Sequence, residues 1–272
     1  MDPARALAGV GLRGRGFSAF LLAGLGLAVT TVVLIIAAQL SYGGDGGGPL
    51  SALGEPDIRH AITLSLWTST AAALGALVVA IPAAYALARW RFRGRVFVDA
   101  LLDVPIVLSP IVIGVALILI FRSQPGRWFE ANVMRIVFEV PGIVVAQFVL
   151  ALALEVRVLK AAFEELSPRY EQVARLLGCS PWGAFWRVTV PMCRSSLLAA
   201  FVLGWSRALG DFGAAVTVAG SVRNKTETMP VAIYNNFASV RIEKALGLAI
   251  LLTTIALVVL VMVRVLTARR DR

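Results

Sequence analysis

Two charged residues stand inside an otherwise apolar stretch in the last third of the chain. Arg207 and Asp211 lie four residues apart in the run GWSRALGDFGAAVTVAG. On a helix, positions four apart share a face, so the two side chains can pair, which lowers the cost of about 2.5–3.5 kcal/mol for each charge near a bilayer centre. We interpret them as an intramembrane pair that holds neighbouring helices together. The alternative is that Arg207 lines a translocation path and compensates a passing anion.

Residues suited to other chemistries are scarce in the sequence. The single histidine, His60, gives little support to a His-ligated zinc or haem centre or to a Ser-His dyad, so we expect no catalytic residue and no metal site. No G-x-x-x-x-G-K-[ST] run occurs, so the chain should not hydrolyse ATP itself. Cys179 and Cys193 fall in a segment that we expect to be cytoplasmic, where structural disulfides are rare.

The composition is that of an integral membrane protein. Of the 272 residues, 58% are hydrophobic and 15% are charged, and the mean hydropathy is +0.82, too apolar for a soluble domain. A membrane span needs roughly 20 predominantly apolar residues. We therefore predict an all-α integral membrane protein with six transmembrane helices. The predicted spans are residues 20–40, 61–88, 104–121, 140–154, 195–221 and 245–263.

The distribution of lysine and arginine predicts the orientation. With both termini in the cytoplasm, the inner segments hold most of the 26 basic residues, so the net charge of +10 is explained by topology, without nucleic acid. The first span follows three arginines, as a secretory signal does, but the five spans behind it favour an uncleaved helix. We divide the chain into a cytoplasmic segment (1–19), a membrane domain (20–266) and a cytoplasmic tail (267–272).

The longest polar stretch lies between the fourth and fifth predicted spans and contains EQVARLLGCSPWGAFWRVTVP, residues 171–191. Ser167 before Pro168 predicts a helix start, and Glu171 in the opening turns complements the helix dipole. Gly178 suits the left-handed conformation that ends a helix. An apolar face on this first helix is formed by Tyr170, Val173, Ala174, Leu176 and Leu177.

A second short helix is predicted directly after the first. Ser180 and Pro181 repeat the signal of a cap followed by proline, and Pro191 is expected to close the unit. One side of this helix is aromatic, with Trp182, Phe185 and Trp186. Such a helix pair suits the lipid headgroup region, and it equally suits a rigid contact that passes force to a partner subunit.

The spacing of this loop resembles the EAA loop of ABC importer permeases. In that family, Glu-Ala-Ala is followed by three residues, a glycine, nine residues and Ile-x-Leu-Pro. The corresponding residues here are Gln172, Val173, Ala174, Gly178, Val188, Val190 and Pro191. The departures are Gln172 in place of Glu, with Glu171 directly before it, and Val173 in place of Ala.

The resemblance implies a cytoplasmic coupling loop, residues 157–194, that docks in a groove on a separate ATP-hydrolysing subunit. ATP and Mg are then bound by that partner, so we expect no cofactor in this chain and no enzymatic activity of its own. The residues expected to carry ATPase coupling are Glu171, Gln172, Ala174, Gly178, Ser180, Trp182, Trp186, Val188 and Pro191.

Three further segments resemble permeases for tetrahedral oxyanions. RALGDFGA is similar to R-x-L-G-E-F-G-A, with Asp211 in place of Glu, and TETMPVAIYNNF is similar to T-x-T-L-P-x-A-I-Y. DVPIVLSPIVIG resembles P-L-V-L-P-P-x-V-I-G, with Ser109 in place of a proline. The resemblance implies a molybdate or tungstate permease, with a sulfate or thiosulfate permease as the alternative. It adds Ser109 to Arg207 and Asp211 as candidates for the translocation path.

The resemblance also implies partners and a location. We expect ABC ATPase subunits, a second copy of this permease in a homodimer, an extracytoplasmic oxyanion-binding protein and membrane lipid. The expected location is the cytoplasmic (inner) membrane of a prokaryote. Two other classes of protein are less favoured alternatives to an ABC permease: a polytopic membrane enzyme and an ion-driven carrier. A carrier ordinarily shows broken helices or repeated halves with several intramembrane charges, whereas only Arg207 and Asp211 are deep here.

Overall fold

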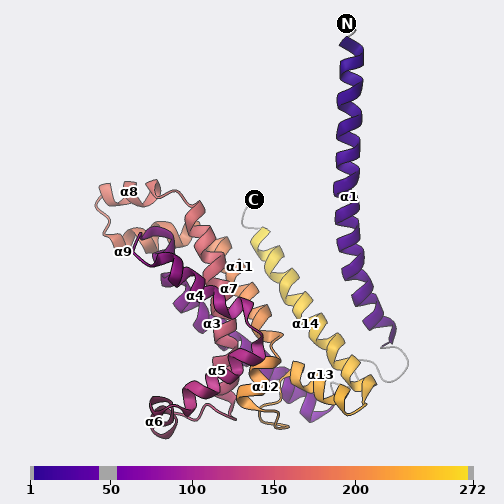
Figure 1. The fold of residues 1–272 in the computed structure, drawn as a ribbon, viewed down its shortest axis with the longest axis vertical. Helices are drawn as coiled ribbons and strands as arrows, with labels where there is room; N and C mark the ends of the chain where they lie inside the picture. The colour runs from indigo at the N-terminus through magenta and orange to yellow at the C-terminus, as the bar shows by residue number, and fades with distance from the viewer. Residues whose placement is uncertain (1–2, 43–53, 269–272) are drawn as a thin grey trace.

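The computed structural model describes residues 3–42 and 54–268 of the chain. All the regular elements in these residues are helices, which confirms the predicted all-α class (Figure 1). Four helices contain stretches long and apolar enough to cross a membrane. These are α1 (Pro3–Tyr42), α3 (Pro56–Arg89), α7 (Val140–Glu165) and α14 (Ile242–Ala268).

Two further pairs of helical segments are sharply bent. Helices α4 (Arg95–Val107) and α5 (Pro110–Arg122) meet at 113°, and the helical stretch Pro181–Met192 meets α11 (Arg194–Leu209) at 73°. Counting each bent pair as one span brings the candidate spans in the described residues to six, the number predicted from the sequence.

The third predicted span, 104–121, is wrong as a single helix. Helix α4 ends at Val107, and Leu108 and Ser109 are both extended before α5 begins at Pro110. A proline disfavours helical backbone in the residue before it, so the chain breaks at Ser109. Apolar composition across the break is continuous, which is why hydropathy alone does not reveal it.

The fifth predicted span, 195–221, is also broken. Helix α11 ends at Leu209, and the short helix α12 (Gly213–Ala219) begins after an interruption that contains Asp211. Arg207 and Asp211 therefore do not share one helix, but their side chains still form the predicted ion pair, with Arg207 Nη1 3.9 Å from Asp211 Oδ1. Glycines on both sides of Asp211 weaken the helix there, because glycine is a poor helix former.

The fourth span continues well past its predicted end at residue 154. Helix α7 runs to Glu165 and ends where Leu166 becomes extended, just before Ser167 and Pro168. Residues 157–165, which we assigned to the coupling loop, therefore belong to α7, and the inner loop begins at Leu166. Good helix formers such as Ala, Leu, Glu and Lys carry the helix onward despite their charges.

Small side chains bring the central helices close together. On α3, Ala72, Ala76, Ala80 and Ala84 are fully buried and spaced four residues apart, so they form one face. That face packs against α7, and α11 packs against both helices. Small residues allow helix backbones to approach closely, as is common where helices associate in a membrane.

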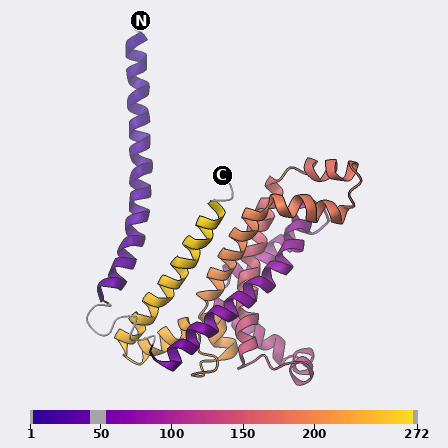
Figure 2. The same ribbon diagram turned by 180° about the vertical axis from the view of Figure 1, so that it is seen from behind.

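The two ends of the molecule differ. Helices α8 (Arg169–Leu176) and α9 (Pro181–Ala184) lie at the end where α1 starts and α14 finishes, while α6 (Gln124–Asn132) and α13 (Met229–Ala238) lie at the opposite end (Figure 1). Figure 2 shows α1 standing apart from the other helices except near its last turns. There, Thr253 Oγ1 donates a hydrogen bond to Gln39 Oε1 at 3.2 Å.

Candidate functional site

The first helix of the inner loop ends as the sequence predicts, but it begins at Arg169, with Pro168 and not Ser167 at the N-cap position. Helix α8 ends at Leu176, and Gly178 adopts a φ of +91°, the left-handed conformation expected there. The N–H of Cys179 donates to the carbonyl of Ala174 at 3.0 Å, which closes the helix end. Because Gly178 has open space around it, the backbone conformation alone requires glycine.

The second helix is longer and less regular than predicted. Ser180 Oγ accepts a hydrogen bond from Gly183 N–H at 3.0 Å, so the predicted cap is present. A π-helical turn, η1 (Phe185–Thr189), and a final turn, α10 (Val190–Met192), follow α9 without a break. Pro191 therefore lies inside the last turn, and the chain bends after Met192 instead of ending at Pro191.

Aromatic side chains join the second helix to α3. The ring of Phe185 is buried and lies 4.6 Å from the ring of Tyr85, between ring centroids. Trp186 lies 5.2 Å from Phe185 and 5.7 Å from Trp182. The cluster thus runs from the core, through Phe185, to the outer surface of the loop.

The outer surface of the inner loop is strongly apolar. Both tryptophans are exposed, and so is most of the apolar face of α8, while Ala174 is buried beneath it. An exposed apolar patch on an otherwise polar loop indicates a surface that a protein partner or membrane lipid covers. We call it the loop patch; its members are Tyr170, Val173, Leu176, Leu177, Trp182 and Trp186.

Glu171 does not belong to this patch. Its carboxylate lies 3.0 Å from Arg89 Nη2 and accepts hydrogen bonds from Tyr85 Oη (2.8 Å) and Thr189 Oγ1 (2.9 Å). The side chains of Arg89 and Glu171 are only 11% and 13% exposed. Glu171 therefore ties the loop to α3, whereas Gln172 beside it is exposed at the loop surface.

The other residues predicted to carry ATPase coupling lie outside the loop patch. Val188 is half-buried, and Pro191 and Ser180 are exposed. The sequence interpretation missed the residues that hold Glu171, since Arg89 was taken only as part of a basic segment that marks orientation. Glu171 and Arg89 are 82 residues apart in the chain, and no local pattern pairs them.

Asp211 caps the short helix α12. One carboxylate oxygen accepts a hydrogen bond from Ala215 N–H at 2.9 Å, and the other accepts from Ala214 N–H at 3.5 Å. The side chain is fully buried, and Arg207 Nη1 lies 3.9 Å from Oδ1. The backbone therefore satisfies Asp211 at least as well as Arg207 does, and the Arg207 side chain remains 32% exposed.

The two helix breaks lie next to each other. A side chain added at Gly213 would sit 3.1 Å from Pro110 Cβ and 3.2 Å from the backbone nitrogen of Ile111. One added at Gly114 would sit 2.6 Å from Thr217 Cβ. Helices α5 and α12 therefore pack backbone against backbone, which brings the Ser109 break beside the Asp211 break. Neither glycine was singled out from the sequence.

Among the described residues, no group of three or more His, Cys, Asp and Glu side chains is arranged to hold a metal ion. The geometry thus offers two functional regions: an inner loop with an exposed apolar patch, and a pair of adjoining helix breaks that carry Ser109, Arg207 and Asp211.

Comparisons with known proteins agree on one kind of membrane protein. Residues 76–272 match the family model described as "Binding-protein-dependent transport system inner membrane component". The sulfate transport system permease protein CysW of Synechocystis sp. is 34% identical over 81% of this chain and 80% of its own length. The molybdenum transport system permease protein ModB of Haemophilus influenzae is 35% identical over 64% of this chain and 78% of its own length.

A solved structure matches the fold over nearly the whole chain. It is a bacterial ABC transporter involved in the import of the acidic polysaccharide alginate, with a TM-score of 0.73 and 16% identity, covering 93% of this chain and 96% of that one. At this identity the likeness concerns the fold alone. The fold described above is therefore shared with a chain of an ABC transporter, although broken helices are also a feature of carriers.

Proposed function

Because the chain belongs to the family of binding-protein-dependent transport system inner membrane components, we propose that it is the permease subunit of a sulfate importer. At the coarser level it is a multi-pass inner-membrane permease of the sulfate and molybdate type of ABC importer, without catalytic activity of its own. Such a subunit works in a complex with a periplasmic binding protein. The choice of anion, the coupling residues and the path residues are parts of the proposal.

The comparisons favour sulfate over the molybdate or tungstate that the motifs favour. Identity does not separate the two groups, since it is 34% for the Synechocystis sulfate permease and 35% for the molybdenum permease. The kind of relative does separate them, because most of the similar proteins are named as sulfate permeases and one is named as a molybdenum permease. Molybdate remains the second candidate because of the relative that carries that name.

The loop patch supports docking on an ATPase subunit that binds ATP and Mg. Leu176, Leu177 and Trp182 are 86%, 82% and 71% exposed, which is unfavourable in water unless a partner covers them. Glu171 and Phe185 attach the same loop firmly to α3. A patch on a rigid, anchored loop transmits the motion of a partner to the membrane helices, which a flexible tether cannot do.

The adjoining helix breaks support a path for a dianion. Broken helices leave polar backbone groups within the membrane, where they are tolerated if they line a water-filled route. Arg207 keeps about a third of its side chain exposed beside this region, because backbone N–H groups satisfy the carboxylate of Asp211. Arg207 is thus available to compensate a passing anion, and Ser109 lies at the neighbouring break.

Transport in reconstituted vesicles tests this proposal. The permease is combined with its ATPase and binding protein, with a second copy of the chain supplied by self-assembly, and uptake of labelled sulfate, molybdate and tungstate is measured. We expect ATP-dependent uptake of sulfate that molybdate inhibits only at higher concentration. A preference for molybdate or tungstate would establish the second candidate, and uptake of none of the three would overturn the oxyanion assignment.

A further inference from the structure

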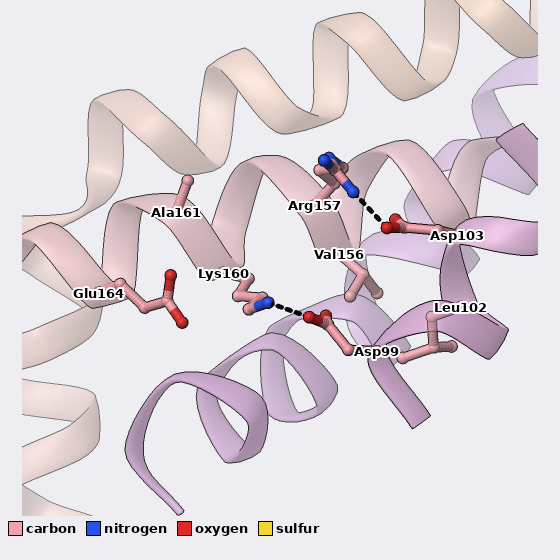
Figure 3. A pocket seen from close by; sticks show the side chains of 8 residues that line it. All are labelled: Asp99, Leu102, Asp103, Val156, Arg157, Lys160, Ala161 and Glu164. Carbon is pink, nitrogen blue, oxygen red and sulfur yellow. Dashed lines mark hydrogen bonds and ion pairs between the residues drawn. The ribbon is translucent and has the colours of Figure 1, made fainter. Parts of the chain in front are cut away.

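Three ion pairs join α4 to α7 in antiparallel order. The interacting residues are four apart on α4 and three or four apart on α7, so each set occupies one face of its helix. Figure 3 shows two of these pairs, Asp103 with Arg157 and Asp99 with Lys160, in which the partner side chains point toward each other from the two helices. We call these two the inner pairs. We call the set the charge ladder: Asp103 with Arg157, Asp99 with Lys160 (2.5 Å) and Arg95 with Glu164 (2.7 Å).

Apart from the ion pairs, Val98 and Leu102 attach α4, because both side chains are half-buried and pack against the core. No residue of α4 is buried, and Val96, Phe97 and Val107 are 83%, 72% and 83% exposed. An element with few buried apolar contacts opens at a low free energy compared with the core. The attachment of α4 therefore rests on this packing and on the charge ladder, whose partly exposed ion pairs are individually weak.

A cavity lies beside the two inner pairs of the ladder. It has a volume of about 320 Å³ and is lined by these pairs together with Leu102, Val156, Ala161 and Glu164 (Figure 3). A water molecule occupies roughly 30 Å³ in the liquid. The cavity thus has room for a tetrahedral dianion with part of its hydration water.

In the inner pairs, the positive and the negative side chains lie on different helices. The inner pairs place two positive groups, Arg157 and Lys160, on α7 and two carboxylates, Asp99 and Asp103, on α4. If α4 moves away, Arg157 and Lys160 present two positive charges on α7, with the carboxylate of Glu164 one turn further on, and the two cations match a dianion such as sulfate or molybdate. When α4 returns, its carboxylates compete with the anion for the same cations.

We propose that the charge ladder is the inner gate of the anion path, and that Arg157 and Lys160 form an exit site for a tetrahedral dianion when the gate is open. The inference rests on the proposed function of an oxyanion permease. It assigns a direction to the last step of transport, because closure of α4 replaces the anion with the carboxylates of Asp99 and Asp103 and expels it.

The inner loop is attached to both sides of this gate. Helix α7 leads through Leu166 into α8, and Arg89 Nη2 on α3 donates to the carbonyl of Leu166 (3.0 Å) as well as to Glu171 (3.0 Å). Helix α4 follows α3 after a turn at Gly94, whose φ is +90°. Movement of the loop therefore reaches α3, which leads into α4, and α7, with which α4 forms its ion pairs.

A reversible cross-link tests the gate without altering the charges. Leu102→Cys on α4 and Val156→Cys on α7 are combined in a chain with Cys179→Ser and Cys193→Ser, and a short thiol-specific cross-linker with a cleavable arm is added after assembly. We expect at least tenfold slower sulfate uptake that recovers when the arm is cleaved, while the ATPase subunits stay bound. Each single cysteine variant with the same reagent is the control. Uptake unchanged by complete cross-linking would overturn the gate.

A set of charge variants tests the exit site. Neutralising both inner pairs, with Asp103→Asn, Arg157→Gln, Asp99→Asn and Lys160→Gln, should slow uptake at least tenfold with normal ATPase binding. Exchanging the cations, with Arg157→Lys and Lys160→Arg, should keep most of the uptake. The matched control is Lys225→Gln with Glu139→Gln, an ion pair at the opposite end of α7. Normal uptake by the neutral variant, or equal loss in the exchanged variant, would reject the exit site.

Failure of the gate is distinguishable from failure of the proposed function. If the wild type transports none of the three oxyanions, the proposed function fails. The cross-linked pair then still reports on the gate through ATP hydrolysis stimulated by the binding protein, which needs no knowledge of the anion. Stimulation lost on cross-linking and restored on cleavage supports the gate, and stimulation that persists refutes it.

Discussion

The carboxylate of Glu155 on α7 fills the space beside Gly204 on α11. A side chain added at Gly204 would lie 2.1 Å from Glu155 Oε1 and 2.7 Å from its Cγ. Glu155 is fully buried, and neither of its carboxylate oxygens has a hydrogen-bond partner among the described residues. The two helices therefore meet here through a fit of shape, at a polar group whose burial no partner offsets.

The fit between these residues predicts a strong effect of a single methyl group. Gly204→Ala should lower the stability of the permease by about 1–3 kcal/mol, because overpacking forces the helices apart. Thermal unfolding in detergent measures the loss. The double change Gly204→Ala with Glu155→Ala should recover stability, and Glu155→Gln, which keeps the shape, should be tolerated. Equal unfolding midpoints for wild type and Gly204→Ala would refute the fit.

Glu171 and Arg89 are expected to couple the loop to the membrane helices. Glu171→Ala leaves the largely buried guanidinium of Arg89 without its carboxylate, so stability should fall by about 3 kcal/mol, as when other buried pairs are broken. Transport should fall further than ATPase binding, because the loop patch remains but its attachment to α3 is lost. Gln172→Ala, at the exposed neighbouring position, is the control and should change unfolding very little. The interpretation fails if the two variants unfold alike.

The cap on α12 predicts which member of the Arg207 and Asp211 pair matters for stability. Asp211→Ala removes the acceptor for two backbone N–H groups and should cost about 1–2 kcal/mol. Asp211→Asn keeps an acceptor and should cost less. Arg207→Ala should unfold close to wild type yet transport the oxyanion slowly if Arg207 lines the path. A larger stability loss for Arg207→Ala than for Asp211→Ala would show that the ion pair dominates instead.

The loop patch predicts a selective loss of assembly. Changing Trp182 and Trp186 together to Ala should reduce ATPase binding at least tenfold, since large apolar side chains dominate interface energies. Membrane insertion should be unaffected, because both side chains lie outside the core. The control is Trp128→Ala, an exposed tryptophan on α6 at the opposite end of the molecule. If copurification of the ATPase is the same in the double variant and the control, the patch is not the docking surface.

The sequence by itself determined the features that depend on composition or on residues within one turn of each other. Apolar runs predicted the all-α class and, if each bent pair counts as one span, the number of candidate spans, because the hydrocarbon thickness fixes the length of a span. The conformation of Gly178 and the cap at Ser180 were also predicted, since capping involves only the neighbouring backbone. The spacing of the loop motif indicated the family in the same local way.

Only the tertiary structure decided which residues meet. Hydropathy does not predict the helix break at Ser109, because the residues around it are apolar. The break at Asp211 becomes clear only from the structure, in which the Asp211 carboxylate caps α12. The orientation of Glu171 towards Arg89, and the pairing of Asp103 with Arg157, join residues 82 and 54 positions apart. Hydropathy and helical periodicity report how each segment meets lipid or water, whereas these contacts depend on how separate helices pack against each other.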